Sequence, residues 1–153
     1  MSFEISPEWV HIQYPESAKF TEVYGFAGSQ GMVNCEGIRF IPKGKPSKTL
    51  AVFMHPATTL QLMPMPRALA QAGVHVLCAG SRFAKNDTPL IMEKVVLDLG
   101  AYLQHAKEKW GYEKILLCGW SGGGSLCLFY QSQAEKLSVE QTPAGEPIDL
   151  SGL

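Results

Sequence analysis

Ser121 lies in the one stretch of this chain whose residue types and spacing predict covalent chemistry. It sits within Gly119-Trp120-Ser121-Gly122-Gly123, directly after the apolar run Ile115–Cys118 and directly before a helical pattern. A tight turn from a buried strand into a helix forces such a serine into a strained backbone conformation and exposes its hydroxyl. We therefore predict that the Ser121 hydroxyl is a nucleophile.

The glycines around this serine have separate expected roles. Gly119 and Gly123 are small because the strand and helix backbones should approach closely at the turn. The N–H of Gly122, at a helix N-terminus, is a natural donor to an oxyanion that forms beside Ser121. A flexible helix start or an anion-binding nest is the alternative. No lysine follows as in a P-loop, and the spacing of a dinucleotide-binding turn is absent.

The turn at Ser121 and the pair His55-Pro56 after an earlier strand together resemble the α/β-hydrolase superfamily, over about residues 20–136. Segments such as Leu50–Pro56 and Lys114–Glu135 look like bacterial serine α/β hydrolases. The resemblance implies hydrolysis of an ester, thioester or related acyl bond through an acyl-serine intermediate. It implies no cofactor and no metal.

The resemblance also implies a second oxyanion donor in the loop after the strand that ends near His55. Pro56 has no N–H, so Ala57 or Thr58 must donate, and we expect Ala57. His55 is expected to orient this loop rather than to act as a base. Thr58 and Trp120 are candidates for lining the site, although Trp120 could instead pack beneath the turn.

The rest of a catalytic triad cannot be assigned. In the family the order is serine, then acid, then histidine, but all the histidines precede Ser121. The carboxylates after it lie on a predicted helix or in the tail: Glu135, Glu140, Glu146 and Asp149. We expect a C-terminal half or a second chain to supply the acid and the histidine. Without it, the apolar strand before Ser121 would be a hydrophobic edge and the last helix would lie uncovered.

The pattern of the chain predicts one α/β domain over residues 1–153 that needs the acid and histidine from elsewhere, with an N-terminal arm (1–19) and a loop-like tail (138–153). Two strands, Phe20–Phe26 and Met32–Ile41, are predicted as an antiparallel hairpin. Continuous apolar runs predict strands buried on both faces; they are Thr49–Met54, Val74–Cys78 and Ile115–Cys118. The predicted helices are Pro64–Ala72, a second from a Thr88 cap to about Gly111, and Ser121 to about Lys136.

This alternation predicts the α/β class: a mostly parallel central sheet flanked by helices, the N-terminal portion of an α/β-hydrolase fold. Arg82 and Asp87 are expected to fix a loop, and Asp98 falls off the apolar stripe of the second helix. His75 and His105 are expected to be structural.

The composition restricts the classes of partner that we expect for this chain. Apolar residues make up 46% of the 153 residues and charged residues 18%, and the net charge is −1. No basic stripe, leader pattern or long apolar run is evident, so no nucleic-acid or membrane partner is expected and a cytoplasmic location is predicted. The four cysteines are expected to be reduced thiols. A catalytically inert binding module, or an acyltransferase or lyase that uses the same serine, stays open as an alternative.

Overall fold

A five-stranded sheet forms the centre of the protein in a computed structural model that describes residues 2–16 and 31–153. The strands lie in the order β1-β2-β4-β3-β5. Their bounds are β1 Ile5–Pro15, β2 Met32–Pro42, β3 Thr49–His55, β4 His75–Gly80 and β5 Lys114–Cys118. The helices are α1 Pro64–Gln71, α2 Met92–Glu108 and α3 Gly122–Glu135.

The direction of the strands corrects the predicted fold class. Strand β1 pairs with β2, and β2 with β4, in antiparallel fashion. Only the pairs that β3 makes with β4 and β5 are parallel. The sheet is therefore mixed, and the prediction of a mostly parallel sheet forming part of an α/β-hydrolase fold is wrong. The expectation went wrong because it was drawn from the apolar runs, which account only for β3, β4 and β5.

The N-terminal region is also different from the prediction. Ile5–Pro15 is not an irregular arm but the strand that pairs with β2 along its whole length. Its two prolines are tolerated because β1 is at the edge of the sheet formed by the described residues, where no further strand of these residues needs their missing N–H groups. The strand predicted at Phe20–Phe26 lies outside the described residues.

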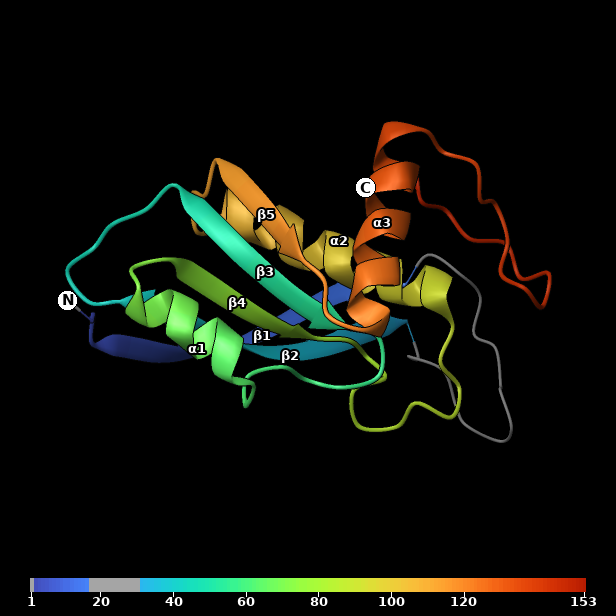
Figure 1. Cartoon of the computed structure of the whole chain (residues 1–153). Coiled ribbons are helices and arrows are strands. Elements are labelled where there is room, and N and C mark those ends of the chain that lie inside the picture. The colour runs from blue at the N-terminus through green and yellow to red at the C-terminus, as the bar shows by residue number, and fades with distance from the viewer. Residues whose placement is uncertain (1, 17–30) are drawn as a thin grey trace.

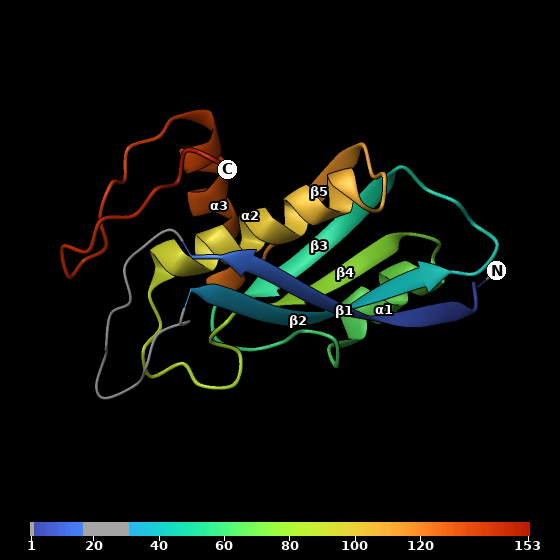
Figure 2. The ribbon, with the colours of Figure 1, turned by 180° about the vertical axis from the view of Figure 1, so that it is seen from behind.

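Helices cover both faces of the sheet (Figures 1 and 2), with α1 on one face and α2 on the other. Alternate residues of β3 point into two apolar clusters. Leu50, Val52 and Met54 join the larger cluster with α2 and Leu126 of α3, and Ala51 and Phe53 join the smaller one with Ala70 of α1. The predicted burial of this strand on both faces is confirmed.

The end of the sheet at β5 is more open. In the described part of the chain β5 pairs only with β3, and Leu116 is 44% exposed. The expectation that β5 is buried on both faces is wrong. The tail after α3 holds neither helix nor strand, only a bridge between Gln141 and Pro147, as predicted.

Helix α2 begins later than its sequence pattern predicts. Thr88 and Pro89 do not cap it; the Thr88 N–H donates to Asn86 Oδ1 and the Leu90 N–H to the Asp87 carbonyl, which closes a turn before the helix. Helices α1 and α3 lie close to their predicted positions. None of the helices in the described residues has the length and apolar character needed to cross a membrane.

Candidate active site

Ser121 occupies a three-residue connection between β5 and α3, where the chain reverses direction sharply. Its backbone has φ 51° and ψ −127°, and it is the only non-glycine residue with positive φ in the described part of the chain. Such a conformation costs about 1–3 kcal/mol in an L-residue and persists only where the surroundings impose it. The side chain is exposed at the N-terminus of α3.

Two glycines make this turn possible. A Cβ atom added to Gly119 would lie 2.5 Å from Gly124 Cα, and one added to Gly123 would lie 2.4 Å from the carbonyl oxygen of Met54. The start of α3 therefore packs directly on the backbone of β3 near its carboxyl end (Figure 1). Because β3 and β5 are parallel, the residues that follow them meet at one edge of the sheet.

The N–H of Gly122 is available to an anion beside Ser121. The next two amides are engaged: the Gly123 N–H donates to Trp120 O at 2.8 Å, and the Gly124 N–H donates to Ser121 O at 3.0 Å. The Gly122 N–H makes no hydrogen bond within the described residues. A free N–H at a helix N-terminus attracts negative charge, and the aligned dipoles of α3 add to that attraction.

The loop after β3 brings His55 against the nucleophile turn. His55 Nε2 lies 3.1 Å from the position that a Cβ on Gly122 would take. The Ala57 N–H donates to His55 Nδ1 at 3.1 Å, so this amide, the predicted second oxyanion donor, is already engaged. Thr58 is exposed at the same loop. Trp120 is 48% exposed, and its ring centroid lies 6.1 Å from that of His55, so it borders the site instead of filling the space beneath the turn.

The described residues bring no base to Ser121, whose Oγ makes no hydrogen bond to any of them. His11 contacts Asn34 on the β1–β2 pair. His75 is buried, with Nδ1 2.7 Å from Tyr112 Oη and Nε2 2.7 Å from Lys45 O. His105 packs edge-on to a tryptophan ring; burial, with Lys109 and Arg39 nearby, lowers its pKa.

Three of the carboxylates that follow Ser121 in the sequence bond to other residues. Glu135 accepts from Gln131, Asp149 from Ser151, and Glu146 pairs with Lys94 at 3.2 Å. The hydrogen bonds from Ser151 lower the pKa of Asp149. None of these contacts involves Ser121, so the described residues place the unpaired N–H of Gly122 beside Ser121 but bring no carboxylate into contact with its hydroxyl.

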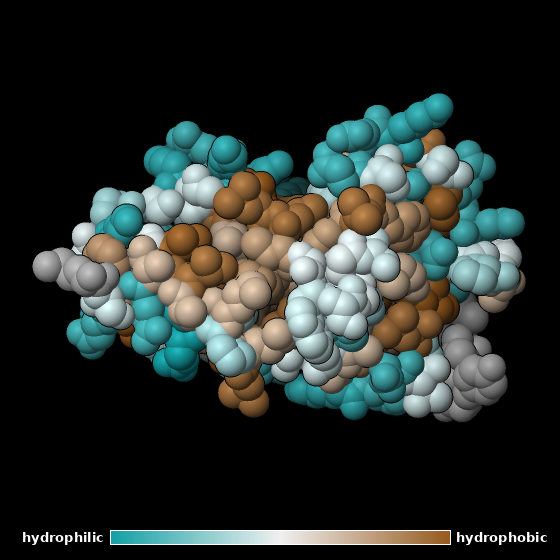
Figure 3. All heavy atoms as spheres, in the orientation of Figure 1, coloured by the Kyte–Doolittle hydropathy of each residue, from teal (hydrophilic) through white to brown (hydrophobic). Residues whose placement is uncertain are grey.

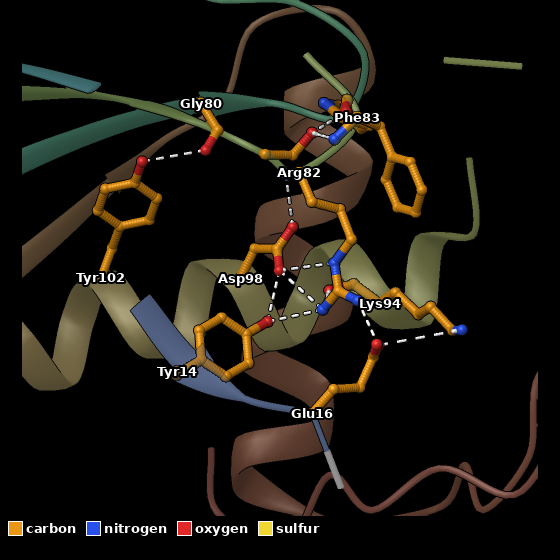
Figure 4. Close-up of polar contacts among 10 residues, drawn as sticks. Tyr14, Glu16, Gly80, Arg82, Phe83, Lys94, Asp98 and Tyr102 are labelled. Atoms are coloured by element: carbon orange, nitrogen blue, oxygen red, sulfur yellow. Dashed lines mark hydrogen bonds and ion pairs between the residues drawn. The ribbon is translucent and has the colours of Figure 1, made fainter. Parts of the chain in front are cut away.

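A buried ionic cluster is formed by Arg82, Asp98, Tyr14 and Glu16 (Figure 4). The sequence did not predict that Asp98, its central residue, is buried. Asp98 of α2 is fully buried instead of lying off the apolar stripe. It accepts the Arg82 N–H at 2.8 Å and the Arg82 Nε–H at 3.0 Å, and the Tyr14 hydroxyl also donates to it. The guanidinium of Arg82 also pairs with Glu16. The signal was available, because Asp98 stands three residues after Val95 and four before Tyr102 on one buried face.

The electrostatics of this cluster raise the pKa values of Arg82 and Tyr14. Burial lowers the pKa of Arg82, but Asp98, Tyr14 and Glu16 together outweigh burial and raise this pKa. Burial, followed by the Asp98 charge, raises the pKa of Tyr14, which keeps this hydroxyl a donor. Ser81, which precedes Arg82 in the chain, connects this loop to the loop after β3, because the Ser81 hydroxyl donates to the carbonyl of Pro56 at 2.6 Å. The expected loop-fixing role of Arg82 is thus visible in these contacts.

The four cysteines are free thiols. Cys35 and Cys78 are buried, and burial raises the pKa of Cys78 to about 12. Cys118 and Cys127 are half-buried near the turn, and burial raises the pKa of both. None of the four is therefore a ready thiolate nucleophile. In the part of the chain that the structure describes, no three His, Cys, Asp or Glu residues are grouped to hold a metal ion.

Comparison with known proteins adds no family to this geometry. No model of a protein family matches the chain, and no curated protein matches it.

Proposed function

We propose that the protein is a serine hydrolase that cleaves an ester, thioester or related acyl bond. The observation that carries the proposal is the strained backbone of Ser121 beside the unpaired N–H of Gly122. The Ser121 oxygen attacks the acyl carbon, and the carbonyl electron pair moves to oxygen. The oxyanion collapses, and the leaving group departs with the proton that Ser121 lost; water then releases the acid from the acyl-serine by the same steps.

An imidazole base from outside the described residues is part of this proposal. A segment or second chain that extends the sheet at β5 would bring that base close to Ser121. Hydrophobic side chains gather over β5 and α3 in Figure 3. Among them Leu116 is 44%, Leu128 75% and Leu137 45% exposed. Exposed apolar area on a strand edge and an adjoining helix favours a polypeptide partner over solvent.

The resemblance to the α/β-hydrolase superfamily is also part of the proposal. It is supported by the turn at Ser121 and by the position of His55, and not by the mixed sheet. The cytoplasmic location stays a prediction from the sequence.

Labelling with a fluorophosphonate probe tests the nucleophile. The protein, isolated with whatever polypeptide accompanies it, should be labelled on Ser121, and Ser121→Ala should abolish the label. Ser125→Ala is the matched control, because Ser125 is an exposed serine one turn further along α3, and labelling should be unchanged. If the Ser121→Ala protein is still labelled, the proposal that Ser121 is the nucleophile is wrong.

A thiol placed at the same position tests the chain without any added base. In Ser121→Cys the new thiol stands at the N-terminus of α3, so its pKa should fall below the value of about 8.5 for a free cysteine. Iodoacetamide at pH 7 should alkylate it about tenfold faster than the new thiol of Ser125→Cys. Peptide mass spectrometry separates both from Cys118 and Cys127. Equal rates would show that the turn does not activate a nucleophile.

A further inference from the structure

The hydrogen bond between Ala57 and His55 determines where the imidazole proton resides. The Ala57 N–H can only donate, so His55 Nδ1 must accept at 3.1 Å. A neutral imidazole that accepts at Nδ1 carries its proton on Nε2. Nε2 makes no hydrogen bond within the described residues. His55 therefore has a free N–H donor on the ring atom that faces the nucleophile turn.

The position of the His55 Nε2–H suggests that it binds an anion beside Ser121. His55 Nε2 lies 3.1 Å from the point where a Cβ of Gly122 would stand, so it is beside the residue whose amide N–H is also unpaired. Two unpaired donors, one from the loop after β3 and one from the start of α3, thus lie at the turn that carries Ser121. Oxyanion holes need two such donors, preorganised before the charge develops. The amide of Ala57 is unavailable because it fixes the imidazole.

We propose that His55 is a catalytic residue that donates its Nε2–H to the substrate oxyanion, together with the N–H of Gly122. This inference rests on the proposed function and names a group for that reaction. When Ser121 Oγ bonds to the acyl carbon, the carbonyl electron pair moves to oxygen, and both donors bind the negative oxygen. They release it when the pair returns and the leaving-group bond breaks. His55 neither gains nor loses a proton in these steps.

The assembly around His55 holds the ring in place for this role. The Ser81 hydroxyl donates to the carbonyl of Pro56 at 2.6 Å and accepts the Phe83 N–H at 3.1 Å, which ties the loop after β3 to the loop after β4. The ring centroids of Trp120 and His55 lie 6.1 Å apart, and His55 is half-buried. A donor that is fixed and partly desolvated stabilises developing charge more strongly than one in water.

A pair of substrates distinguishes oxyanion binding from a structural role. Sulfur accepts hydrogen bonds weakly, so a site with good oxyanion donors should hydrolyse an oxoester much faster than the matched thionoester. In the unlabelled protein, isolated with whatever polypeptide accompanies it, His55→Phe should lower kcat for the oxoester by about 10²–10³ with little change in KM. In His55→Phe the ratio of the oxoester rate to the thionoester rate should also fall, because thionoester turnover depends less on the lost hydrogen-bond donor.

Two further variants control for folding. In His55→Gln the side-chain amide can accept from Ala57 and still donate, so it should retain much of the oxoester rate. His11→Phe removes an exposed imidazole from β1, at the other edge of the sheet from β5, and should leave both rates unchanged. A His55→Phe protein with an unaltered rate ratio, while Ser121→Ala still abolishes turnover, would overturn the role of His55 and leave the proposed function standing.

Nitrogen NMR of the unmodified chain tests the same inference without turnover. The ¹⁵N spectrum should show the neutral His55 ring protonated on Nε2 and not on Nδ1. After a phosphonate bonds to Ser121, the Nε2–H signal should move downfield as it meets the phosphonyl oxygen. A proton on Nδ1 would overturn the inference whether or not Ser121 reacts.

Discussion

Gly123→Ala should destabilise the protein by about 3 kcal/mol, because the new methyl group meets backbone that cannot move away. Its Cβ would lie 2.4 Å from the carbonyl oxygen of Met54, a fully buried residue in the middle of the core. Either α3 shifts away from β3 or the turn at Ser121 distorts. Urea unfolding followed by circular dichroism measures the change, and the labelling of Ser121 should be lost in the same variant.

Gly124→Ala is the matched control for this clash. It is the next residue of α3, and a Cβ there meets no atom within 4 Å. Alanine should stabilise the helix by about 0.5–1 kcal/mol, so the two variants should move the urea midpoint in opposite directions. Equal shifts for both would show that α3 does not sit as closely on β3 as the structure has it.

Arg82→Ala should destabilise the protein by about 3–5 kcal/mol, because it leaves a buried carboxylate without its cation. The Arg82 side chain is 12% exposed and that of Asp98 0%, so water cannot replace the lost partner. The Tyr14 hydroxyl would remain the only side-chain donor to Asp98 in the described residues. Thermal and urea unfolding measure the effect.

Lys85→Ala provides the comparison on the surface. Lys85 pairs with Glu36 at 2.7 Å, but its side chain is 83% exposed. Loss of this pair should change stability by less than about 1 kcal/mol. Replacing both members of the buried pair, in Arg82→Met with Asp98→Leu, should restore part of the stability that Arg82→Ala loses. If Arg82→Ala and Lys85→Ala have similar effects, the buried ionic cluster does not stabilise the fold.

The sequence predicted the parts of the fold that a single segment determines. Continuous apolar runs located β3 and β4, and the predicted bounds of α1 and α3 lie close to those of the structure. It could not predict the sheet order or the mixed strand directions, because these depend on which segments meet in space. Ile5–Pro15 was misread because proline usually interrupts a strand, and only its place at the sheet edge makes it acceptable.

In the candidate site, too, only the features that a single segment determines were predictable from the sequence. The turn at Ser121 is local, and glycine spacing between a strand and a helix was enough to predict it. Whether the Ala57 amide is free depends on the rotamer of His55, and no sequence pattern encodes that. Asp98 was misplaced because a carboxylate on an amphipathic helix is usually solvated, and the cation that allows its burial comes from Arg82, sixteen residues earlier.

The backbone of Ser121 has a consequence for how this position could change over time. Glycine adopts positive φ at no steric cost, so Ser121→Gly would relieve strain that every other common replacement retains. Selection for stability alone would thus favour loss of the hydroxyl by a single substitution. A serine at this position is therefore a more costly choice for folding than glycine.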